Sequence, residues 1–167
     1  MDPHSDNDEG GWPLETFQTL FAAHGFAHDR SGDDEIVATG ESSWGEVELR
    51  ILWRPDDRAF QLLALPGITV ADEARGRIYE VLSLVNEQLW LGHFELWSSG
   101  GTILFRHAVP VDDAADPPVA LAVAATLVDT ALDECERFYP VFQFVLWGGK
   151  SPAEAMAAAL IETHGEA

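Results

Sequence analysis

Residues 46–65, EVELRILWRPDDRAFQLLAL, decide the fold because they carry the pattern of a β-hairpin. In the first half, apolar side chains alternate with charged ones, as in a strand that buries one face. Residues 55–58, Pro-Asp-Asp-Arg, are typical of a turn, and residues 59–65 return as the partner strand. If the hairpin closes on Asp56 and Asp57, Trp53 faces Phe60 across the ladder, and Ile51 faces Leu62.

A second hairpin is predicted around Gly100-Gly101, since alternating residues precede this pair and residues 102–109 return after it. A two-residue loop sets Glu95 opposite Arg106 and Leu96 opposite Phe105. The opposite charges of Glu95 and Arg106 support that register.

Helical patterns surround the two hairpins, at residues 13–24, 71–91, 119–147 and 152–163. We expect Pro140 to kink or break the third of these helices. Residues 35–39 add a short strand before the first hairpin. The order α-β-β-β-α-β-β-α-α predicts an α+β fold with antiparallel strands, in a single domain over residues 12–164. Residues 1–11 are acidic and aperiodic, and are predicted to form a disordered tail.

The charge balance limits the classes of partner. The chain of 167 residues has 29 acidic and 9 basic residues, for a formal net charge of −20. Such a surface repels nucleic-acid phosphates and anionic lipids, so we expect neither nucleic-acid nor membrane binding. The single Cys135 and the absence of signal-peptide features near Met1 favour a cytoplasmic location.

The residues that carry chemistry form no catalytic pattern. His24 and His28 have helical metal-ligand spacing, but Gly25 interrupts it. His93 and His107 are predicted to point to opposite faces of the second hairpin. Cys135 lies among carboxylates that raise a thiol pKa. We therefore expect no catalytic site, no cofactor and no metal.

The second hairpin also supplies the candidate partner-binding surface. Trp97 lies on the more polar face, with Glu95 and Arg106, and the two-residue loop places Leu104 opposite it. Exposed aromatic residues often anchor interfaces, so these four residues are the candidate site for a protein partner or a second copy of the chain. Alternatively, the C-terminal helices cover this face and bury Trp97.

Residues 86–109, NEQLWLGHFELWSSGGTILFRHAV, resemble the centre of the YbjN family of bacterial sensory transduction regulators. The matching features are Asn86, Gly92-His93-Phe94, the glycine-containing turn and Phe105-Arg106. Phe138-Tyr139-Pro140, Gly149 and residues 151–155 resemble the C-terminal pattern, so that the resemblance spans residues 12–160.

The resemblance implies a fold like that of type III secretion chaperones: a curved antiparallel sheet with packed helices, often dimeric. It implies regulatory or chaperone-like binding and brings no catalytic residues. The expected function is thus a non-enzymatic protein-binding module, with a homodimer as the expected assembly. A small ligand-binding or enzymatic domain is the alternative, and a metal-dependent sensor is a third.

Overall fold

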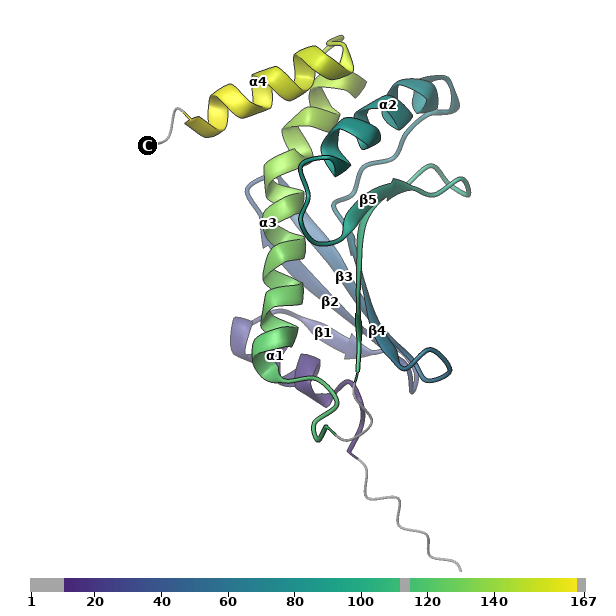
Figure 1. Cartoon of the computed structure of the whole chain (residues 1–167), viewed down its shortest axis with the longest axis vertical. Coiled ribbons are helices and arrows are strands. Elements are labelled where there is room, and N and C mark those ends of the chain that lie inside the picture. The colour runs from purple at the N-terminus through teal and green to yellow at the C-terminus, as the bar shows by residue number, and fades with distance from the viewer. Residues whose placement is uncertain (1–10, 112–114, 165–167) are drawn as a thin grey trace, which may run out of the picture.

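The alternating strands form one six-stranded antiparallel sheet with the order β1-β2-β3-β4-β6-β5 (Figure 1). The computed structural model describes residues 11–111 and 115–164. Its elements are α1 (Glu15–His24), β1 (His28–Arg30), β2 (Glu35–Ser42), β3 (Gly45–Arg54), β4 (Ala59–Leu65), the short helix η1 (Asp72–Ala74), α2 (Arg75–Asn86), β5 (His93–Leu96), β6 (Ile103–Pro110), α3 (Leu121–Leu146) and α4 (Pro152–His164). The α+β fold is confirmed, and the structure adds β1 to the predicted order.

The helices pack against one face of the sheet, and α2 and α4 lie beside the C-terminal half of α3 (Figure 1). Aromatic contacts join the two layers. The Phe17 ring of α1 lies 5.3 Å from the Phe60 ring of β4, and the Phe94 ring of β5 lies 5.5 Å from the Phe142 ring of α3. No polar or charged residue is buried within the described part of the chain. Apolar burial between these layers is therefore the main stabilising term.

The opposite face of the sheet carries no helix of the described chain (Figure 1). A row of directly paired residues crosses five strands on this face: Val37, Arg50, Leu63, Arg106 and His93. We call this side of the sheet the open face. It is the one broad surface where strand side chains are free of a helical layer among the residues that the structure describes.

The two hairpins differ in how well their registers were predicted. In the first, Trp53 pairs with Phe60 and Ile51 with Leu62, as expected. In the second, Glu95 pairs with Leu104, and His93 with Arg106, so the predicted register is wrong by two residues. The turn spans residues 97–102 and is closed by a hydrogen bond from the Trp97 N–H to the Thr102 carbonyl at 2.9 Å, and Thr102 also forms a bridge with Thr69.

α3 continues through Pro140, although a kink or break was expected there. Proline lacks the N–H that would bond to the carbonyl of Glu136, four residues earlier. The indole N–H of Trp44, from the turn between β2 and β3, donates to that carbonyl at 3.1 Å. The Trp44 ring also stacks on Tyr139, with the ring centroids 5.6 Å apart. The helix therefore tolerates the proline because a partner outside it takes the carbonyl.

The predicted disordered tail, residues 1–11, lies outside the described residues except for Gly11. Over the described ranges, none of the helices combines the length and apolar character that crossing a membrane requires.

Candidate partner-binding surface

The candidate surface is built around Glu95, which lies on β5 at one end of the open face. Its carboxylate accepts hydrogen bonds from Arg106 Nε at 3.0 Å and from the indole Nε1 of Trp97 at 2.9 Å. His93 Nε2 lies 3.0 Å from the other carboxylate oxygen. One carboxylate thus fixes the positions of an arginine, a tryptophan and a histidine.

The environment of Glu95 keeps its carboxylate ionised. Partial burial would raise its pKa, but the hydrogen bonds from Arg106, His93 and Trp97 outweigh this, and the net pKa is lowered. Although the register was predicted wrongly, the ion pair between Glu95 and Arg106 exists, because a shift of two residues leaves both side chains on one face. The two residues therefore meet diagonally across the ladder.

Trp97 and Leu104 have different surroundings. Trp97 is 37% exposed, so the C-terminal helices do not bury it, and α3 packs against the other face of the sheet. Leu104 is fully buried and lies opposite Glu95, not opposite Trp97 as expected. The accessible part of the candidate set is thus Trp97, Glu95 and Arg106, and Leu104 lies beneath them.

The turn that carries Trp97 is held in place at its far end. Val70 N–H donates to the Gly101 carbonyl at 2.7 Å, and an Arg75 guanidinium N–H donates to the Ser98 carbonyl at 3.0 Å. These bonds connect the turn to the segment that leads into α2. Trp97 is therefore presented from a restrained turn.

The open face continues away from Trp97 as a mixed polar and apolar surface. Arg50 lies within ion-pair distance of both Glu35 and Glu48. A shallow groove of about 400 Å³ lies beside Glu48, with Val37 and Leu65 in its wall. This surface can provide charged hydrogen-bonding groups at its periphery and apolar contacts between them. Alternation in these strands could be predicted from the sequence, but the groove could not, because it depends on the order of the strands in the sheet.

The remaining candidate residues do not assemble into a reactive centre. His24 ends α1 and His28 begins β1, and Gly25 between them has the left-handed φ of 71°. Burial raises the pKa of the Cys135 thiol to about 12, with a smaller contribution from the charge of Glu134. No three potential metal ligands cluster among the residues that the structure covers.

Two of the residues that suggested the family resemblance shape the base of β5. The Asn86 side chain accepts a hydrogen bond from Phe94 N–H at 2.8 Å and donates one to the Phe94 carbonyl at 3.0 Å. Gly92 has φ of 70°, and a Cβ there would lie 2.4 Å from the Phe105 ring. Both residues position β5, and thereby Glu95 and Trp97.

An antiparallel sheet covered by helices on one face and open on the other defines a small α+β protein. Residues 13–144 match the model of the family described as "YbjN: Putative bacterial sensory transduction regulator". The chain belongs to the YbjN family. Residues 149–155, whose pattern also resembled the family, lie beyond the matched range.

Among solved structures, the chain is similar to the crystal structure of YbjN from E. coli, described as "a putative transcription regulator". The TM-score is 0.53 at 12% sequence identity, with 74% of this chain and 85% of that chain covered. This similarity supports the fold. No curated protein matches the chain.

Proposed function

We propose that this chain is a non-enzymatic regulatory module that binds a protein partner, in a chaperone-like manner, through the open face around Trp97. The observation that carries the proposal is the Glu95 cluster, in which a 37% exposed tryptophan and an arginine are fixed by one carboxylate on a face without helices. Tryptophan and arginine are the residue types most enriched at interface hot spots. Because the cluster is already ordered, binding loses little side-chain entropy.

The charge of the chain indicates the chemistry of the partner. At a net charge of −20, a partner with a basic surface is attracted and an acidic one is repelled. Glu46 and Glu48 border the groove on the open face, so basic side chains of the partner could reach carboxylates there. We expect association to weaken as the salt concentration rises. A second copy of the chain would have to overcome this repulsion through apolar contacts, and a homodimer is the assembly to test first.

Site-specific photo-crosslinking tests the surface. Benzoylphenylalanine in place of Trp97 is expected to give specific crosslinks in native lysate, or to a second copy of the purified chain. The control is the same replacement at Trp147, which is 63% exposed beyond the C-terminal end of α3. Equal crosslinking from the two positions, or none from position 97, would contradict the proposal.

Light scattering after size-exclusion chromatography, across a concentration series, measures self-association directly. Trp97→Ala is expected to stay folded by circular dichroism and to lose the association. If Trp97→Ala unfolds the chain, Trp97 is part of the fold and the proposed surface is wrong.

A further inference from the structure

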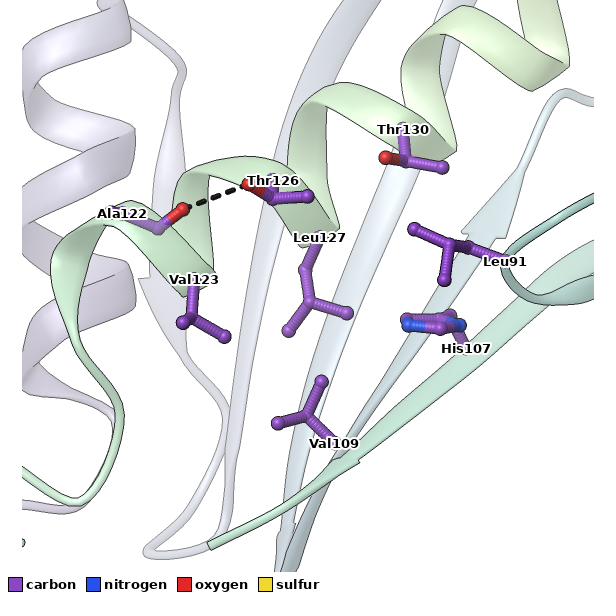
Figure 2. Close-up of a pocket in the computed structure, with 8 residues that line it drawn as sticks. All are labelled: Leu91, His107, Val109, Ala122, Val123, Thr126, Leu127 and Thr130. Atoms are coloured by element: carbon purple, nitrogen blue, oxygen red, sulfur yellow. Dashed lines mark hydrogen bonds between the residues drawn. The ribbon is translucent and has the colours of Figure 1, made fainter.

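A pocket of about 250 Å³ opens between α3 and β6, on the helix-bearing side of the sheet (Figure 2). It lies on the opposite side of the sheet from Trp97, so it is independent of the proposed function. Side chains of α3, β6 and the segment before β5 surround it: Leu91, His107, Val109, Val123 and Leu127.

The wall of the pocket is apolar and partly open to water. Leu91 is 46% exposed and Val123 is 40% exposed at this pocket, although both are large hydrophobic residues. The Thr126 hydroxyl, which also borders the pocket, donates to the Ala122 carbonyl at 3.0 Å and is thereby used within α3 (Figure 2). No Asp, Glu, Lys or Arg is among the lining residues. A charged ligand would therefore lose its hydration without gaining an ion pair.

His107 is the titratable group in this wall. It alternates with Phe105 and Val109 on the helix-facing side of β6 and pairs with Leu62 of β4. Burial lowers its pKa, with a smaller effect from His93, so the ring is neutral near pH 7. Neither ring nitrogen is hydrogen-bonded to an atom of the described residues. A neutral imidazole offers one donor and one acceptor.

We propose that this pocket binds a small uncharged organic molecule of about one ring, whose single hydrogen-bonding group meets His107. The ring would lie against Val109, Val123 and Leu127. Pockets for drug-sized molecules begin at roughly 300 Å³. At about 250 Å³ this pocket is slightly smaller, so its size suits a molecule of about one ring. An apolar wall with a small number of polar groups is the usual composition of such sites, and here the Thr130 hydroxyl lines the pocket together with His107.

Phenol and benzene are matched probes, because they share the ring and differ by one hydroxyl. In NMR titrations of the full chain, phenol is expected to shift the methyl signals of Val109, Val123 and Leu127 and to saturate. Benzene is expected to shift the same signals with about fivefold weaker affinity, the effect of one net hydrogen bond. His107→Leu should reduce the affinity for phenol to that for benzene.

A filling variant tests the location without relying on His107. Ala122→Phe, at an exposed position in the pocket wall, should abolish the binding of both probes. Ala157→Phe, at an exposed position in α4, should leave both unchanged. Shifts that do not saturate, or an undiminished affinity in Ala122→Phe, would overturn the site. Equal affinities of the folded chain for phenol and benzene would overturn the role of His107.

Discussion

Glu95 is the residue on which the shape of the candidate surface depends. Its carboxylate has donors from β5, β6 and the turn between them, so these three parts of the hairpin share one acceptor. The side chain is 29% exposed, so that its bonds are partly screened from water. Replacing Glu95 with an uncharged residue should therefore both destabilise the hairpin and leave the Trp97 side chain less ordered.

Glu95→Gln is expected to lower the free energy of unfolding by about 1 kcal/mol, since bonds to a charged group are lost at a partly exposed site. Because the pKa of Glu95 is lowered in the folded chain, the unfolded chain binds the proton first as the pH falls. The contribution of Glu95 is therefore complete above about pH 4.5 and is lost on acidification through the folded pKa.

Urea denaturation of the unmodified chain and of Glu95→Gln across a pH series measures the difference between their free energies of unfolding. It should be constant near neutral pH and shrink below about pH 4.5. Glu80→Gln, at an exposed position of α2, serves as the control and should change little. A difference that persists undiminished in acid would show that the charge of Glu95 is not the cause.

Gly92 and Gly76 form a contrasting pair of glycines. Gly92→Ala places a Cβ in a left-handed backbone and against both the Phe105 ring and the Arg106 carbonyl. We expect a loss of about 3 kcal/mol, from backbone strain and overpacking combined. Gly76→Ala in α2 meets no atom within 4 Å and should gain about 0.5 kcal/mol. Thermal unfolding of the two variants gives the comparison, and equal effects would contradict it.

At the scale of elements, the sequence was informative where one face of a strand is buried. The alternation in residues 46–65, with the turn residues 55–58 between its two halves, predicted the correct register. The second register was wrong because Val70 and Thr69 bind the residues after Gly100. That interaction joins segments about thirty residues apart, and no local pattern contains it.

β1 escaped prediction for a related reason. Its residues, His28, Asp29 and Arg30, are polar and mostly exposed, so it has no apolar alternation. Within the sheet, it pairs with β2. α2 was predicted too long because the apolar stripe extends to Leu89, while the helix ends at Asn86, whose side chain binds the Phe94 backbone.

The contact between Trp44 and α3 can be tested by a double-mutant cycle. Trp44→Phe removes the N–H that serves the Glu136 carbonyl and should cost about 1 kcal/mol. Pro140→Ala restores the helical N–H donor for that carbonyl, so Trp44→Phe should cost less in that background. Chemical denaturation of the four proteins gives the coupling. If Trp44→Phe costs the same with Pro140 as with Ala at that position, the two residues are not coupled through the Glu136 carbonyl.

At the scale of the whole molecule, the acidic surface opposes the compact state. Among the described residues no charge is fully buried, so the repulsion is spread over the surface and is screened by salt. Raising KCl from about 0.02 to about 0.5 M should stabilise the fold by on the order of 1 kcal/mol, or about 3 °C in Tm. Calorimetry at the two salt concentrations measures it. A Tm that falls with salt would show that ion pairs, such as Arg50 with Glu35, outweigh the repulsion.

One of the two candidate sites could be predicted from the sequence, and the other could not. Trp97, Glu95 and Arg106 could be named because they share one hairpin. The pocket at His107 could not, since its wall joins β6 to α3 and to Leu91. His93 and His107 do point to opposite faces of the sheet, as predicted. That His107 also faces a pocket depends on how α3 crosses the sheet.

The two outermost strands of the sheet are short, with three residues in β1 and four in β5. An exposed strand edge is the usual template on which copies add one after another into a fibre. Here such an edge offers only a few free backbone groups, while the open face, through which we propose that the chain binds, is the broader surface. Copies that stack face to face occupy each other's surface and stop at a pair. If copies of this chain pair through the open face, concentrated solutions should therefore contain closed particles of fixed size and should not gel.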